Sequence, residues 1–105
     1  MKNAEATNFS FIEAVLLRPQ MYTTSGTYAE TIAFLEGYFS GLAKGDPYAV
    51  PVAEWTSFRS RLSQELQTSS DEAFGKFREL YTDDETALVE ARNRAGRLRA
   101  EPQGK

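Results

Sequence analysis

Carboxylates dominate the side chains of this sequence that could do chemistry. The chain of 105 residues has 15 Asp and Glu residues but no His and no Cys. The densest acidic cluster is Asp83, Asp84 and Glu85. Paired carboxylates act as acid and base only where their environments separate their pKa values. These three stand at an expected helix start, where the helix dipole favours acidic residues. We therefore predict no catalytic residues and a protein that is not an enzyme.

The residue types that hold metals and cofactors are also missing or scattered. Without Cys the chain has no disulfides, thiolate zinc sites or cysteine nucleophiles. Without His it lacks the commonest metal ligand and the commonest general base. The seven glycines form no phosphate-binding loop, and no loop alternates Asp and Asn as a calcium site would. We predict no metal site and no cofactor.

Four arginines near the C-terminus are the main basic feature, at positions 92, 94, 97 and 99. They could contact a nucleic acid, but no aromatic residues are interleaved with them to stack on bases. Glu90 precedes Arg94 by four residues, a favourable helical pair. Residues 1–90 carry a net charge of −7 and residues 91–105 a net charge of +4. We interpret the arginines as a solvated helix end matched to the dipole, and we predict no binding to nucleic acid.

The composition is that of one small folded domain. Hydrophobic residues make up 41% of the chain and charged residues 26%, which is ordinary globular usage. No apolar run approaches the ~20 residues that a membrane span needs, and the first ten residues lack the apolar stretch of a secretory signal. We therefore expect a cytoplasmic protein without a membrane segment. The predicted organisation is a flexible N-terminus at 1–9, a helical domain at 10–100 and a disordered tail at 101–105.

The spacing of the apolar residues predicts an all-α fold, a single-domain bundle of about five helices joined by short loops. Four capping boxes, S/T-x-x-E, mark expected helix starts at Ser10, Thr27, Ser69 and Thr82. Pro51 suits the first turn of another helix, and Pro19 should end the first helix near Leu17 or Arg18. The longest apolar stripe consists of Tyr28, Ile32, Leu35, Phe39 and Leu42.

Some single residues in this bundle have two possible roles. Gly37 and Gly41 lie four apart inside an expected helix, where each costs about 1 kcal/mol relative to Ala. Close approach of another helix, from this chain or from a partner, would account for them. Trp55 is expected in the core. Tyr22 lies in the loop 18–26, where it either fills a gap in the bundle or anchors an interface.

Two families resemble the segment from Ile12 to Tyr22. Gyrase-type ATPases have a similar segment, E-A-V-x-x-R-P-x-M-Y. Their ATP site needs a following helix similar to E-x-x-D-N, whereas this chain has Phe34-Leu-Glu-Gly-Tyr-Phe-Ser40. An ATPase of that kind would not fit into 105 residues. This likeness implies a shared loop, without the activity.

The second resemblance extends further along the chain. Small bacterial immunity proteins of polymorphic toxin systems have a short helix, an R-P-x-M-Y loop and then a helix with F-L-x-G-Y. The matching segments here are Arg18-Pro-Gln-Met-Tyr22 and Phe34-Leu-Glu-Gly-Tyr38. Gln20 stands where Gly is usual in that pattern. The resemblance implies an antitoxin that binds and neutralises a cognate toxin by occluding it.

The leading hypothesis is therefore an immunity-like inhibitor of a toxin with a basic surface. The alternative is a non-enzymatic structural or adaptor module, phage- or plasmid-borne, that acts through protein–protein contacts. Regulation through nucleic acid and a small enzyme are weaker alternatives. Acidic and aromatic side chains would make the contacts. The candidate partner-binding residues are Tyr22, Glu30, Glu36, Tyr38, Asp83, Asp84 and Glu85. We expect Glu30 and Glu36 to face solvent, because both fall off the apolar stripe of their helix.

Overall fold

The computed structural model describes residues 8–100, and in this range the chain forms five α-helices, one short 3-10 helix and no β-strand. The elements are α1 (Asn8–Leu17), η1 (Pro19–Met21), α2 (Tyr28–Gly45), α3 (Val50–Leu66), α4 (Ala73–Glu79) and α5 (Asp84–Ala100). They form one unit of 38 × 31 × 29 Å. The predicted all-α bundle is confirmed. Residues 1–7 and the predicted tail at 101–105 lie outside the described residues.

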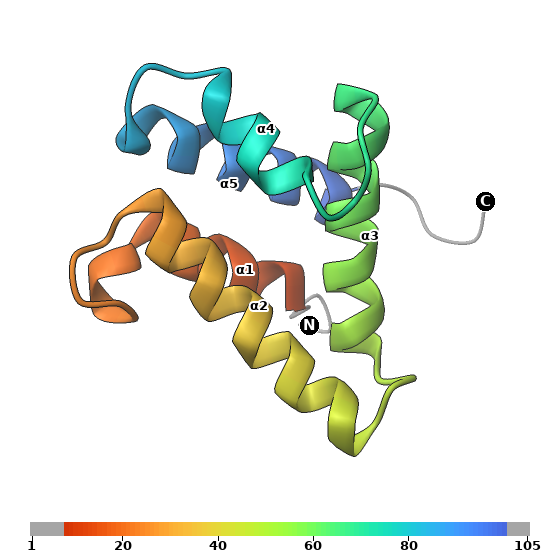
Figure 1. The fold of residues 1–105 in the computed structure, drawn as a ribbon. Coiled ribbons are helices and arrows are strands. Elements are labelled where there is room, and N and C mark those ends of the chain that lie inside the picture. Colours follow the sequence, from red (N-terminus) through yellow and green to blue (C-terminus); the bar gives the residue numbers. More distant parts are fainter. Residues whose placement is uncertain (1–7, 101–105) are drawn as a thin grey trace.

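Helix α1 lies against α2, α3 and α5 (Figure 1) and contributes Ile12, Val15 and Leu16 to the core. It packs along α5, although the two helices come from opposite ends of the chain. Ile12 and Val15 of α1 are fully buried, as are three small side chains of α5, Ala87, Ala91 and Ala95. Small side chains allow two helices to approach closely. As predicted, Pro19 follows the end of α1 at Leu17.

An aromatic stack joins three helices on the other side of the core. Trp55 of α3 stacks on Phe39 of α2 and on Phe74 of α4, with ring centroids 5.2 Å apart in both pairs. Trp55 is only 6% exposed, so its predicted place in the core is confirmed. Stacked aromatic pairs contribute about 0.5–1.5 kcal/mol beyond the area that they bury. The stack therefore helps to fix α2, α3 and α4 against one another.

The capping predictions are confirmed at one helix and wrong at three. At α2 the Thr27 side chain accepts a hydrogen bond from the Glu30 amide, as predicted. Ser10 lies inside α1, which already includes Asn8, and the Glu13 carboxylate accepts from Arg99. Helix α4 begins only at Ala73, with no side-chain cap.

The start of α5 differs from the prediction by one residue. Asp83, rather than Thr82, accepts the hydrogen bond that caps the helix, from the Thr86 amide at 2.7 Å. A carboxylate is a strong acceptor at this position, because it also interacts favourably with the helix dipole.

No helix of this chain packs closely on Gly37 and Gly41 among the described residues, so that explanation of the two glycines is wrong. Both glycines are exposed, and a Cβ atom added at either would meet nothing within 4 Å. Neither glycine is therefore needed for packing among the residues that the structure describes.

Candidate protein-binding surface

A groove of about 560 Å³ opens between the loop after α1 and the first turns of α5. Its apolar part includes Leu17 and Val89, which are 53% and 39% exposed, over the buried Leu88. Asp84 and Glu85 contribute carboxylates. The lining residues are Leu16, Leu17, Pro19, Gln20, Ser25, Gly26, Thr27, Asp84, Glu85, Leu88 and Val89. We call this feature the acidic groove. It joins the R-P-x-M-Y loop to the acidic helix start, more than 50 residues further along the chain.

Local hydrogen bonds order the loop on one side of the acidic groove. The carbonyl oxygen of Pro19 accepts from the Tyr22 amide at 3.0 Å, the Thr23 amide at 2.9 Å and the Thr23 hydroxyl at 3.0 Å. The Thr23 hydroxyl oxygen in turn accepts from the Gly26 amide at 2.9 Å. Gly26 has a φ of 72°, and an added Cβ would lie 2.5 Å from the Gln20 Cγ. Glycine is therefore required here by both backbone conformation and space.

Glu30 braces this loop from the start of α2. One of its carboxylate oxygens accepts hydrogen bonds from the Ser25 amide and the Ser25 hydroxyl, both at 2.8 Å. The Ser25 amide is the main reason that the pKa of Glu30 lies below its ordinary value. Glu30 is exposed as predicted. It therefore keeps its negative charge beside the acidic groove while holding Ser25 in the groove wall.

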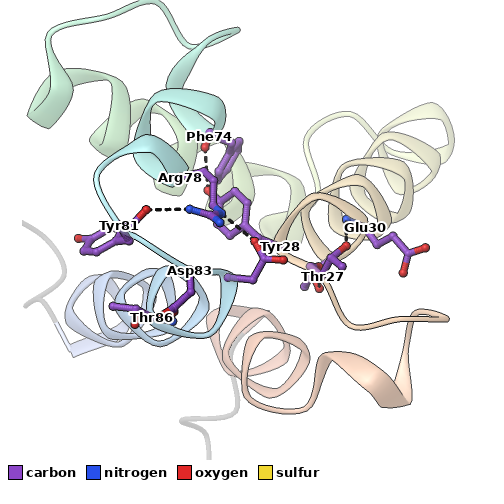
Figure 2. Close-up of polar contacts among 10 residues, drawn as sticks. Thr27, Tyr28, Glu30, Phe74, Arg78, Tyr81, Asp83 and Thr86 are labelled. Atoms are coloured by element: carbon purple, nitrogen blue, oxygen red, sulfur yellow. Dashed lines mark hydrogen bonds and ion pairs between the residues drawn. The ribbon is translucent and has the colours of Figure 1, made fainter.

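The three consecutive acids have three different roles, and Figure 2 shows the first of them, Asp83, beside Thr86. Asp83 caps α5, and the hydrogen bond from the Thr86 amide is the main cause of its lowered pKa. Asp84 accepts from the Arg78 Nε at 2.7 Å, and the same guanidinium donates to the Tyr81 carbonyl at 2.8 Å. These contacts hold the loop between α4 and α5. Glu85 is exposed and makes no contact of this kind with the described residues, so its charge is the most available to a partner.

The two predicted tyrosines lie in an aromatic cluster between α1 and α2. Tyr22 is half-buried, with its ring centroid 6.0 Å from Phe11 and 5.7 Å from Phe34. Tyr38 is 41% exposed and lies 4.8 Å from Phe11. Tyr22 therefore fills a gap in the bundle, whereas Tyr38 leaves much of its ring accessible.

Glu36 lies apart from the groove, and its expected exposure is only partly correct. Its Oε2 forms an ion pair with the Arg59 Nη2 at 2.7 Å, which links α2 to α3. The two side chains keep 43% and 28% of their area exposed. Arg59 also lies over the Phe74 ring, 5.7 Å from its centroid. Glu36 therefore helps to hold α2 against α3 while part of its side chain stays exposed. A helix face that lies off the main apolar stripe can still contact a neighbouring helix.

Sequence reasoning missed the apolar residues of the acidic groove. Leu17 and Val89 each directly follow a buried leucine, Leu16 and Leu88. Each therefore lies off the apolar face of its helix, and this position is the sequence feature that indicates an exposed apolar side chain. Apolar side chains on the exposed face of a helix mark a possible contact site when they occur together.

Two of the C-terminal arginines join helices, which corrects their interpretation as a solvated helix end. Arg94 donates to both carboxylate oxygens of Glu65 on α3, at 3.2 and 2.7 Å, and to Glu90 at 3.1 Å. Arg99 donates to Glu13 on α1 at 2.7 Å. Hydrogen bonds from Arg94 are the main cause of the lowered pKa of Glu65. The arginines therefore stabilise the docking of α5 as well as its dipole.

The part of the chain that the structure describes contains no cluster of three or more acidic, His or Cys residues that could hold a metal ion. None of its helices combines the length and apolar character needed to cross a membrane. Comparison with protein-family models, curated proteins and solved structures finds no match for this chain.

Proposed function

We propose that this chain binds and neutralises a toxin that has a basic surface, as the small bacterial immunity proteins that its sequence resembles neutralise their cognate toxins. The observation that carries the proposal is the acidic groove, where the exposed apolar side chains Leu17 and Val89 lie beside the carboxylates of Asp84 and Glu85. Protein interfaces commonly combine an apolar centre with a charged rim. The groove offers both in a small area.

Charge supports a basic partner. Residues 1–90 carry a net charge of −7, and the groove and its surroundings include Glu30, Asp84 and Glu85. Opposite charges on two surfaces accelerate encounter and disfavour wrong partners. Asp84 is partly neutralised by Arg78, so Glu85 and Glu30 would provide most of the attraction.

The mechanism would be occlusion. An apolar side chain of the toxin, flanked by Lys or Arg, would enter the groove between Leu17 and Val89, while its cations meet the carboxylates at the rim. The toxin surface around that segment would then be covered. The loop is held by Pro19, Thr23 and Glu30, so little conformational entropy would be lost when the partner binds.

The test is co-expression with the protein encoded immediately upstream, followed by measurements of growth and of association rate. We expect the wild-type chain to restore growth and to bind the purified partner. Glu85→Lys should slow association by about tenfold and weaken its salt dependence. Val89→Ser should increase the dissociation rate. Glu79→Lys is the matched control, because Glu79 is exposed on α4 and does not line the groove.

The outcomes distinguish the alternatives. Slower association and weaker protection in Glu85→Lys, with both unchanged in Glu79→Lys, would support the proposal. Melting temperatures of the variants would show that the fold persists. Binding without protection would favour the adaptor module. A wild-type chain that neither binds the upstream product nor restores growth would refute the proposal.

A further inference from the structure

A second concave site lies at the end of α5 opposite to the acidic groove. At this end α5 packs against α3 (Figure 1). Its volume is about 370 Å³, near the lower end of the range for small-ligand pockets, roughly 300–1,000 Å³. It is lined by Phe58, Arg61, Leu62, Gln64, Glu65, Arg94, Arg97 and Leu98. It shares no lining residue with the acidic groove. We call it the α3–α5 pocket.

The floor of the α3–α5 pocket is apolar. Phe58 and Leu62 come from α3 and Leu98 comes from α5, and all three are buried at 7% exposure or less. The lining also includes three arginines, and the aliphatic stems of such side chains can cover apolar surface while their charged ends reach water. A ligand with an apolar body therefore matches this floor better than a wholly polar one.

The mouth of the pocket is positively charged on an otherwise acidic protein. Arg61, Arg94 and Arg97 surround it, with Glu65 as the one acid among the lining residues, which gives this set a formal charge of +2. The Arg94 guanidinium is engaged by Glu65 and Glu90. Arg97 is exposed and has no ion pair with the described residues, which makes it the side chain most able to take a new anion.

Glu65 restricts the charge of that anion. Its carboxylate stays ionised, because Arg94 and the more distant charge of Arg97 stabilise it. A doubly charged phosphate at the mouth would be repelled by this carboxylate, since like charges at short range oppose each other. A single carboxylate on the Arg97 side would form a charge-assisted, bidentate contact with much less repulsion.

We propose that the α3–α5 pocket binds a small amphipathic monocarboxylate, with its apolar body over Phe58, Leu62 and Leu98 and its carboxylate on Arg97. This site goes beyond the proposed function, because it requires no protein partner and uses none of the residues of the acidic groove. Occupancy would also connect α3 to α5 through the ligand, and would therefore raise the melting temperature by mass action.

The test is titration of the full chain with sodium octanoate, followed by amide NMR and calorimetry. We expect saturable 1:1 binding, with the largest shifts at Leu62 and Leu98. Octanol has the same apolar body without the charge and should bind at least about tenfold more weakly, because it cannot form the charge-assisted contact with Arg97. Butyrate has the charge with a shorter body and should also bind more weakly.

Matched variants test the role of Arg97. Arg97→Gln should weaken octanoate binding by about tenfold, whereas Arg92→Gln removes the same charge from the same helix without touching the pocket. Gln64→Glu adds an acid at an exposed position of the mouth and should weaken binding too. This variant keeps the proposal testable if Arg97→Gln is poorly folded.

Three results would overturn the proposal. The first is the absence of saturable octanoate binding to the wild-type chain. The second is binding that Arg97→Gln and Gln64→Glu both leave unchanged. The third is a set of chemical-shift changes spread over the whole surface, as expected of non-specific association.

Discussion

Replacing Tyr28 with Phe isolates one buried hydroxyl that connects the start of α2 to α4. The Tyr28 hydroxyl donates to the Phe74 carbonyl at 2.8 Å, and the side chain is only 4% exposed (Figure 2). The Tyr28→Phe variant keeps the ring and its packing but loses the donor. A buried acceptor that loses its partner costs about 1–3 kcal/mol. We therefore expect the free energy of unfolding at neutral pH to fall by about 1–2 kcal/mol, because the ring itself is retained.

The same hydroxyl gives the prediction a pH signature. Burial is the main reason that the pKa of Tyr28 is raised well above its ordinary value of about 10. Above that value the unfolded chain loses this proton while the folded chain keeps it, so folding becomes less favourable as the pH rises. The wild-type chain should lose about 1.4 kcal/mol per pH unit from this group, whereas Tyr28→Phe has no such group to titrate.

Chemical unfolding followed by circular dichroism from pH 7 to about pH 11 measures both effects. Every other titrating group is shared, so the difference between the two proteins isolates Tyr28. That difference should be largest near neutral pH and should shrink by about 1.4 kcal/mol at one unit above the ordinary pKa. Tyr48→Phe is the control, because Tyr48 is 92% exposed and its substitution should change stability by no more than about 0.5 kcal/mol at neutral pH. A difference that is absent at neutral pH, or constant throughout, would refute the reasoning.

Three other substitutions test the geometry of the fold by thermal and urea unfolding. Gly37→Ala should stabilise α2 by about 0.5–1 kcal/mol, because the added Cβ enters open space. Gly26→Ala should instead destabilise the fold by at least about 1 kcal/mol, because this position has a positive φ and its added Cβ would meet Gln20. Arg94→Lys should cost about 1 kcal/mol despite the retained charge, because lysine lacks the two-pronged contact with Glu65. The pKa of Glu65 is lowered in the folded state, so the Glu65–Arg94 pair stabilises the fold above the ordinary pKa of Glu. That stabilisation should disappear as the pH falls through the lowered pKa. Equal acid sensitivity of the wild-type chain and Arg94→Lys would contradict this assignment.

The parts of the fold that depend on neighbouring residues could be predicted from the sequence. The Thr27 cap joins residues three apart, and Pro19 acts on the residue before it, so both follow from local chemistry. The cap of α5 was misplaced by one residue because Thr82 and Asp83 are both good caps and only the backbone conformation selects between them. At α5 the capping pattern therefore predicts the helix start to within one residue but not the capping residue.

The candidate site could be predicted only in part, because it depends on how helices pack. The loop at 18–26 and the acids at 83–85 were recognised separately, but nothing local indicated that they line one groove. Likewise, Arg99 and Glu13 lie 86 residues apart in the chain and meet only because α5 packs along α1. Exposed apolar residues such as Val89 acquire meaning only when the helix that faces them is known.

Helix α5 carries both proposed sites, and its geometry implies that they act independently. Glu85 lines the acidic groove near the helix start, and Arg97 lines the α3–α5 pocket near its end. Twelve residues of helix separate them by roughly 18 Å, which exceeds the screening length of about 8 Å at physiological salt. Substitutions at distant sites with no shared partner usually have additive effects. Glu85→Lys combined with Arg97→Gln should therefore slow protein association as much as the first alone, and weaken octanoate binding as much as the second alone. Measuring both activities on the double variant checks this expectation, and a non-additive result would show that α5 transmits a change from one end to the other.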